Sequence, residues 1–141
     1  MASRDALWRR FVLDYDIEVP EDKIQNELEY IKLEMRHRMQ YDRMSGGGLH
    51  MFPEQELAEQ ADELHEAAVF EAKSDLVLKD IIAKQGISAT PEELVAEGER
   101  IAREQSSTID MVKRFFGDDF AGLERDVCER KAIDWALSQG R

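Results

Sequence analysis

The chain has three histidines, and the residues around His65 have types and a spacing that suggest metal binding. Asp62, His65 and Glu66 fall on one face of a predicted helix, with Glu59 about one turn earlier. A carboxylate three residues before a histidine is half of the ligand set of a di-iron site in a helical bundle, and such a site needs a second motif of the same kind. The sequence contains no second motif. We therefore favour a solvated polar face and expect no metal and no other cofactor.

Nucleophilic catalysis has little support in the sequence. Cys128 follows Val127 on the apolar side of the last predicted helix, and no histidine occurs after His65. A small buried hydrophobic side chain is the better interpretation of this cysteine. There is no G-x-S-x-G turn and no phosphate-binding glycine loop between a strand and a helix. We therefore expect no catalytic residue and no enzymatic activity.

The composition favours a helical protein with a strongly acidic surface. The 141 residues are 43% hydrophobic and 35% charged, with only 8 glycines and 3 prolines, and the net charge is −12. Few turn residues and many charges are typical of long helices with one wet face. The negative field disfavours nucleic acid as a partner. No apolar run is long enough to span a membrane or to act as a signal peptide, so we expect a cytoplasmic chain with no membrane partner.

Hydrophobic periodicity predicts six helices and no strand. One apolar stripe runs through Ile24, Leu28, Ile31, Met35 and Met39 at helical spacing. In "SATPEEL", Thr90 is a predicted N-cap with Pro91 and Glu93 completing a capping box. The predicted helices span about residues 5–15, 20–44, 53–86, 91–104, 108–116 and 118–138.

The length of the third predicted helix indicates an elongated molecule. A helix over residues 53–86 would be about 50 Å long, whereas a compact chain of this size has a radius of gyration of about 14 Å. We therefore expect an all-α, elongated multi-helix domain spanning residues 1–141. In it, an antiparallel two-helix arm (20–86), joined by the glycine loop "SGGG", projects from a helical body (91–138).

The far end of this predicted arm is rich in methionine. Flexible, polarizable methionine side chains suit surfaces that bind varied partners, and an exposed apolar end usually marks a binding site. Met35 and Met39 fit equally well as seam residues against the third helix. For the aromatic residues of the body, burial between helices is the favoured interpretation. The candidate binding residues are Met35, Met39, Met44, Leu49, Met51 and Phe52 on the arm, and Phe115, Phe116 and Phe120 on the body.

A basic cluster near the end of the second predicted helix has a simpler explanation than docking. Cations near a helix C-terminus complement the helix dipole, and we favour this interpretation over a docking patch. The cluster comprises Lys32, Arg36, His37, Arg38 and Arg43.

The order of motifs resembles the C-terminal chaperone domain of bacterial trigger factor. The segments "IEVPEDKIQNELEYI", "LVLKDIIAKQGISATPEELVAEGERIA", "MVKRFF" and "DVCERKAIDWAL" follow one another as the helices of that family do. The resemblance covers about residues 7–137 and implies that residues 5–15 are the end of a linker helix. No segment resembles the family's ribosome-docking region or its β-rich prolyl isomerase domain, which implies a stand-alone or excised chaperone domain.

The resemblance implies an ATP-independent holdase that binds exposed apolar segments of unfolded or nascent polypeptides. The alternative is a structural or regulatory helical module that uses the same apolar end for one specific partner or for its own homodimer. A prolyl isomerase is disfavoured, because no predicted strand is available to form an aromatic-lined active site.

Overall fold

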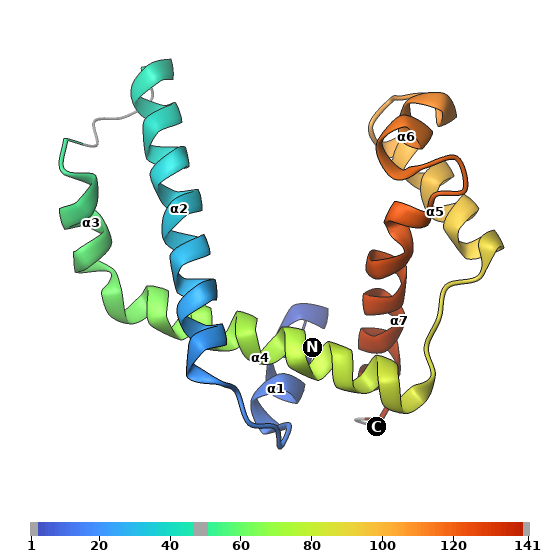
Figure 1. Cartoon of the computed structure of the whole chain (residues 1–141), viewed down its shortest axis with the longest axis horizontal. Coiled ribbons are helices and arrows are strands. Elements are labelled where there is room, and N and C mark those ends of the chain that lie inside the picture. The colour runs from blue at the N-terminus through green and yellow to red at the C-terminus, as the bar shows by residue number, and fades with distance from the viewer. Residues whose placement is uncertain (1–2, 47–50, 140–141) are drawn as a thin grey trace. The chain divides into compact units, whose positions relative to one another are not determined.

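The computed structural model describes residues 3–46 and 51–139, and these residues form helices without any strand. The all-α fold class predicted from the sequence is confirmed. No described helix is both long and apolar enough to cross a membrane. The described elements, coloured in chain order in Figure 1, are α1 (Arg4–Asp14), α2 (Glu21–Ser45), α3 (Pro53–Glu59), α4 (Ala61–Gln85), α5 (Pro91–Glu104), α6 (Ile109–Phe116), the 3₁₀-helix η1 (Ala121–Leu123) and α7 (Glu124–Gln139).

The chain divides into two compact units. Residues Val12–Val77 form one, which we call the hairpin unit. Residues Met1–Phe11 together with Leu78–Arg141 form the other, which we call the C-terminal unit. The boundaries fall inside α1 and α4, so each of these helices contributes residues to both units.

Helices α2 and α3 of the hairpin unit run in opposite directions beside each other (Figure 1). Helix α2 ends at Gly46, which adopts a left-handed conformation (φ 75°) and donates its backbone N–H to the carbonyl of Asp42. Glycine suits this position because a Cβ atom disfavours the left-handed region. Helix α3 begins at Pro53, a favoured first helical residue.

The expectation of one helix over residues 53–86 is wrong, because the helix breaks at Gln60. Gln60 has φ −102° and ψ 14°, and its N–H bonds to the carbonyls of Leu57 and Ala58. Its own carbonyl accepts the first hydrogen bond of α4, from the N–H of Leu64 at 2.9 Å. The chain turns there, so that α3 packs along the end of α2 while α4 crosses the start of α2 (Figure 1).

The hairpin unit has two apolar clusters along the inner stripe of α2. Near its start, Ile24 packs on Ala68 and Ala72, which are fully buried and allow the two helices to approach closely. Near its end, Met39 packs with Leu57 and Leu64. The stripe predicted from the sequence is therefore the face that α2 buries.

The predicted cap of α5 in the C-terminal unit is confirmed. The Thr90 hydroxyl accepts a hydrogen bond from the Glu93 N–H at 3.1 Å, and the Glu93 carboxylate accepts one from the Thr90 N–H at 2.9 Å. Lys131 of α7 donates to the same carboxylate at 2.9 Å. These bonds lower the pKa of Glu93, led by the bond from the Thr90 backbone. The cap therefore also ties α7 to the start of α5.

Phe120 lies at the centre of the C-terminal unit. Its side chain is buried in a cluster with Ala102, Val112 and Leu123. Its backbone adopts φ 59°, an uncommon conformation for a residue with a Cβ atom. The last helix was expected to begin near Asp118. The structure instead forms a turn and η1 first, because Phe120 must be directed into the core, and α7 begins at Glu124.

A buried carboxylate links α5 to α7. The Glu97 side chain is 5% exposed and accepts hydrogen bonds from Arg100 of α5 and from Arg130 of α7, the latter at 2.7 Å. The hydrogen bond from Arg100 is the main reason that the pKa of Glu97 is lowered, and burial opposes it. Two cations satisfy this carboxylate, as a buried charge requires.

Candidate binding surface

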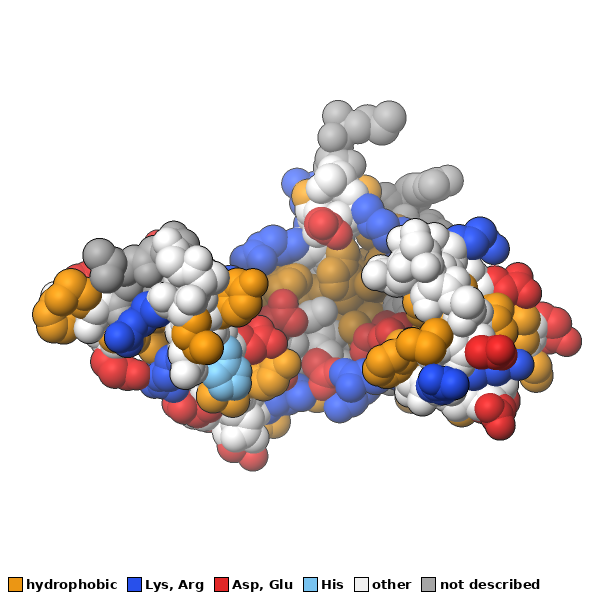
Figure 2. Space-filling model, turned by 90° about the horizontal axis from the view of Figure 1, so that it is seen from above, with side chains coloured by type: hydrophobic (Ala, Val, Ile, Leu, Met, Phe, Trp, Pro, Cys, Tyr) orange, Lys and Arg blue, Asp and Glu red, His pale blue; other side chains and the backbone are white. Residues whose placement is uncertain are grey.

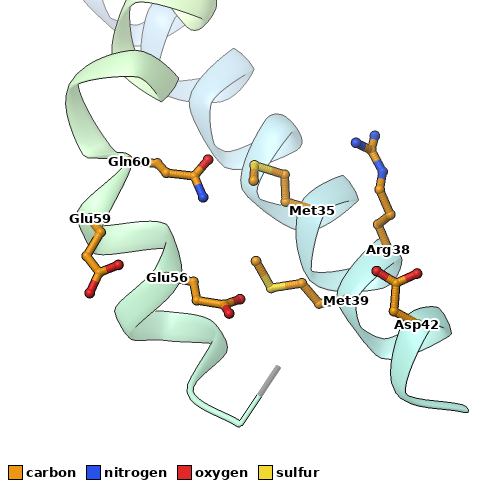
Figure 3. Close-up of a pocket in the computed structure, with 7 residues that line it drawn as sticks. All are labelled: Met35, Arg38, Met39, Asp42, Glu56, Glu59 and Gln60. Carbon is orange, nitrogen blue, oxygen red and sulfur yellow. The ribbon is translucent and has the colours of Figure 1, made fainter. Parts of the chain in front are cut away.

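Two methionines of α2 face α3 across an open groove. Met35 and Met39 point from α2 toward the side of α3 that carries Glu56, as Figure 3 shows. Met39 is buried in the cluster with Leu57 and Leu64, while Met35 is half-buried against it. The groove has a volume of about 390 Å³ and is lined by Met35, Arg38, Met39, Asp42, Glu56, Glu59 and Gln60.

A second hollow of about 290 Å³ lies next to this groove. It is lined by Met51, Phe52, Gln55, Glu56 and Glu59. Glu56 and Glu59 line both hollows. Each hollow therefore combines apolar side chains with an acidic edge.

Three strongly exposed apolar side chains of the hairpin unit lie at this end. Met44 is 82% exposed, Met51 is 69% exposed and Phe52 is 65% exposed. We call these three residues the apolar tip. Figure 2 shows hydrophobic side chains at the surface over the ends of α2 and α3, next to acidic and basic ones. Leu49, the remaining candidate on the arm, lies outside the described residues.

An ion pair holds α3 against α2 beside the groove. Arg36 donates two hydrogen bonds to the Glu54 carboxylate, from Nε at 2.7 Å and from Nη2 at 3.0 Å. This pairing lowers the pKa of Glu54 and raises that of Arg36. The two parallel hydrogen bonds favour one orientation of α3 beside α2, but both side chains are solvent-accessible, so the pair contributes little stability. Arg36 of the predicted basic cluster is therefore used inside the chain.

The three aromatic candidates of the C-terminal unit differ in their accessibility. Phe120 is 3% exposed, so it belongs to the core and offers no surface to a partner. Phe116 is half-buried and packs against the same core. Phe115 is 79% exposed, with its ring centroid 6.5 Å from that of Phe116. The burial between helices that the sequence favoured for this trio holds for Phe120 and in part for Phe116.

Several exposed apolar residues were missing from the candidate set. Met111, 42% exposed, lies four residues before Phe115 on α6, and this spacing on a short amphipathic helix was a usable signal. Helix α2 also exposes Tyr30, Leu33 and Tyr41 on the side away from its buried stripe. Leu33 follows Tyr30 by three residues and Tyr41 follows Leu33 by eight, and the charged residues between them made this pattern hard to recognise in the sequence.

The residues considered for metal and thiol chemistry have ordinary surroundings. Among the described residues, no group of three or more His, Cys, Asp or Glu side chains is placed to hold a metal ion. Asp62, His65 and Glu66 are exposed. Cys128 is buried, as predicted, and burial is the main reason that the pKa of its thiol is raised.

The described residues are all-α with exposed apolar side chains at one end of the hairpin unit, and the sequence assigns the family. Residues 2–138 match the family described as bacterial trigger factor protein (TF) C-terminus. The chain therefore belongs to this family, and the resemblance seen in the motif order is confirmed.

Individual relatives are trigger factors of several bacteria. The chain is 27% identical to a trigger factor of Carboxydothermus hydrogenoformans over 89% of this chain and 30% of that protein. It is 26% identical to one of Anoxybacillus flavithermus, over 99% of this chain and 32% of that protein. It is 29% identical to one of Bacillus cereus, over 95% and 31% respectively. The chain spans about a third of the length of these relatives. No solved structure matches it.

Family membership indicates a chaperone-type function for the chain. The C-terminal domain of this family is a chaperone module and generally not an enzyme.

Proposed function

We propose that the chain is an ATP-independent holdase that binds exposed apolar segments of unfolded or nascent polypeptides in the cytoplasm. The observation that carries this proposal is the apolar tip, where Met44, Met51 and Phe52 lie exposed and where Met51 and Phe52 line an acidic-edged hollow. Exposed apolar side chains gathered at one end, in a member of a chaperone family, are the expected form of such a surface.

The chemistry of the tip fits clients of varied shape. Methionine has three rotatable side-chain bonds and a polarizable sulfur, so it adapts to different apolar surfaces. Burial of an apolar side chain contributes about 1.5–3 kcal/mol when it is complete, and less when it is partial. Three partly covered side chains therefore support binding that is weak enough to reverse without a nucleotide.

Of the original candidates, the proposal retains those whose side chains are accessible. Met44, Met51 and Phe52 form its main part, and half-buried Met35 lines the adjoining groove. Leu49 stays a candidate. Met39 and Phe120 are buried and act as core residues that support the surface around them.

In the C-terminal unit the proposal retains Phe115, with Phe116 behind it and Met111 beside it on α6. This second patch is small, so we expect it to add to client binding rather than to capture a client alone.

The test is suppression of aggregation of several unrelated denatured proteins, followed by light scattering. We compare wild type with a triple variant of the tip, Met44→Ser, Met51→Ser and Phe52→Ser. Loss of about 1 kcal/mol at each position would weaken client binding about a hundredfold. Circular dichroism checks that the variant keeps its helical content.

A matched control changes three exposed apolar residues that do not belong to the tip, Leu7→Ser, Leu13→Ser and Val95→Ser, which are 42%, 56% and 42% exposed. We expect this variant to suppress aggregation as wild type does. Equal loss in both variants would show that general surface hydrophobicity, and not the tip, is responsible. No suppression of any client by wild type would refute the holdase function itself.

A further inference from the structure

The described methionines differ widely in their exposure to solvent. Met44 is 82% exposed and Met51 is 69% exposed, whereas Met39 is 7% exposed and Met35 is half-buried. Met111 of the C-terminal unit is 42% exposed. A buried thioether is shielded from a dissolved oxidant, so exposure ranks the reactivity of these side chains. The two most exposed of these five methionines both belong to the apolar tip.

The surroundings of Met111 lower its reactivity further. Its sulfur accepts a hydrogen bond from Nη1 of Arg114 at 3.8 Å. Oxidation of a thioether begins with attack by a sulfur lone pair, and a hydrogen bond from a cation draws electron density away from that sulfur. Met111 is therefore an internal comparison, exposed on its helix but less reactive than the methionines of the tip.

The one cysteine of the chain does not compete for the oxidant. Cys128 is buried, and burial is the main reason that the pKa of its thiol is raised. Peroxides react with the thiolate form, which is scarce when a thiol is buried and its pKa is high. The sulfur that a dissolved oxidant meets first is therefore thioether sulfur.

We propose that Met44 and Met51 are a paired oxidation site, whose conversion to methionine sulfoxide by hydrogen peroxide reversibly weakens client binding at the apolar tip. This inference rests on the proposed holdase function and adds a regulation of the same surface. At each methionine a sulfur lone pair attacks one peroxide oxygen, so that an S–O bond forms and the O–O bond breaks. The sulfur is oxidised by two electrons, and the departing hydroxide takes the proton of the transferred oxygen and leaves as water.

The sulfoxide makes the tip unsuitable for apolar segments. It replaces a flexible apolar side chain by a polar one. An apolar client segment that covers a sulfoxide removes water from its oxygen and offers no hydrogen bond in return. Glu56 and Glu59, which line the hollow beside Met51, cannot satisfy this oxygen either, because carboxylates only accept hydrogen bonds. Oxidation therefore lowers the affinity of the tip for its clients.

The same oxidation leaves the packing of the hairpin unit in place. Met39 packs with Leu57 and Leu64, and its burial protects it from the oxidant. Met44 and Met51 expose most of their surface, so little packing is lost when they become polar. Methionine sulfoxide reductases can reverse the change, with a dithiol supplying two electrons and the oxygen leaving as water. The arrangement separates a reversible change at the surface from damage to the core.

The first test is the rate of oxidation at each methionine of the whole chain in hydrogen peroxide, followed by mass spectrometry of its peptides. Met44 and Met51 should oxidise at least about tenfold faster than Met39, with Met111 in between. The same reaction in concentrated urea, where every methionine is exposed, should make the rates nearly equal. Equal rates in the native protein would overturn the proposed site.

The second test is suppression of aggregation before and after peroxide treatment, with each protein compared with its own untreated form. Once Met44 and Met51 are oxidised, wild type should bind clients at least about tenfold more weakly, with unchanged circular dichroism. Incubation with dithiothreitol and the two reductases, one for each sulfoxide epimer, should restore the suppression.

Two variants assign the effect to the tip. Met44→Leu with Met51→Leu keeps apolar side chains but removes both sulfur atoms, so peroxide should no longer change its suppression of aggregation. The matched control, Met111→Leu, keeps both methionines of the tip and should lose as much activity on oxidation as wild type does.

The outcomes distinguish this inference from the holdase proposal. If untreated wild type suppresses aggregation and oxidation of the tip leaves that suppression unchanged, the oxidation site is refuted while the holdase function stands. An equal loss in the double leucine variant has the same consequence. If untreated wild type suppresses no client, the holdase function is refuted, and the regulation proposed for it is refuted as well.

Discussion

Replacement of Gly98 by alanine tests how the core of the C-terminal unit is packed. A Cβ atom at Gly98 would lie 2.5, 2.7 and 2.8 Å from three ring atoms of Phe120. Ordinary carbon contacts are about 3.5–4.0 Å long, so the ring has to move by about 1 Å. The ring is 3% exposed and is buried in one cluster with Ala102, Val112 and Leu123. Gly98→Ala therefore creates a steric conflict inside a closed core.

Two opposing effects determine the magnitude. Overpacking of a core costs about 1–3 kcal/mol, whereas alanine is favoured over glycine in a helix by about 1 kcal/mol. Because all three contacts would be shorter than 3.0 Å, the overpacking cost belongs to the upper part of its range, and we expect the free energy of unfolding to fall by about 1–2 kcal/mol, measured by urea unfolding with circular dichroism. The control is Glu99→Ala on the next, exposed position of α5, which should change this free energy by less than about 0.5 kcal/mol.

A double variant isolates the steric contact. Phe120→Leu leaves a smaller side chain opposite position 98, so Gly98→Ala should cost at least about 1 kcal/mol less in that background than in wild type. If Gly98→Ala instead stabilises the protein by about 1 kcal/mol, as helix propensity alone predicts, the close packing of Gly98 on Phe120 is refuted.

Three further predictions concern the helix links and the cysteine. Glu97→Gln should lower the free energy of unfolding at neutral pH by about 1–3 kcal/mol, because Arg100 and Arg130 lose a charged acceptor. The pKa of Glu97 is lowered from 4.5 in the folded state, so its stabilisation is complete above pH 4.5 and is lost as the pH falls through the lower folded value. In the variant, the free energy of unfolding should lack this part of its dependence on pH. Urea unfolding at a series of pH values from about 3 to about 7 would show the difference. Thr90→Ala should lower the free energy of unfolding by about 1 kcal/mol through loss of the N-cap, with Thr90→Ser as a control that keeps the hydroxyl. Cys128 should react with a thiol reagent only after unfolding, since its thiol is buried and its pKa is raised; fast labelling of the native protein would contradict the burial.

Local signals in the sequence were sufficient for several parts of the fold. The capping box at Thr90 and the end of α6 at Gly117 depend on residues within one helical turn, so they could be predicted. The break at Gln60 could not, because no glycine or proline marks it. It follows from packing, since α3 and α4 bury their apolar residues against different parts of α2. The predicted start of α7 was wrong, because burial of Phe120 requires a left-handed backbone conformation at that residue, and no local pattern in the sequence indicates it.

The exposed apolar end of the hairpin unit could be predicted as a region, but the burial of its individual residues could not. A methionine-rich end was visible in the sequence, but burial of Met39 depends on Leu57 and Leu64, and its contact with them requires the tertiary fold. The exposed residues Tyr30, Leu33 and Tyr41 were overlooked because the buried stripe of α2 already explained the pattern of that helix.

Helix α3 has only seven residues, fewer than a peptide needs to stay helical by itself in water. Its contacts with α2 stabilise it: Leu57 is buried, and Arg36 donates two hydrogen bonds to Glu54. Because so few contacts hold α3, we expect it to separate from α2 more readily than the longer helices of the hairpin unit separate from each other. Its separation would expose Leu57 and Met39, which are buried against each other in the closed arrangement, and would enlarge the apolar surface next to the groove.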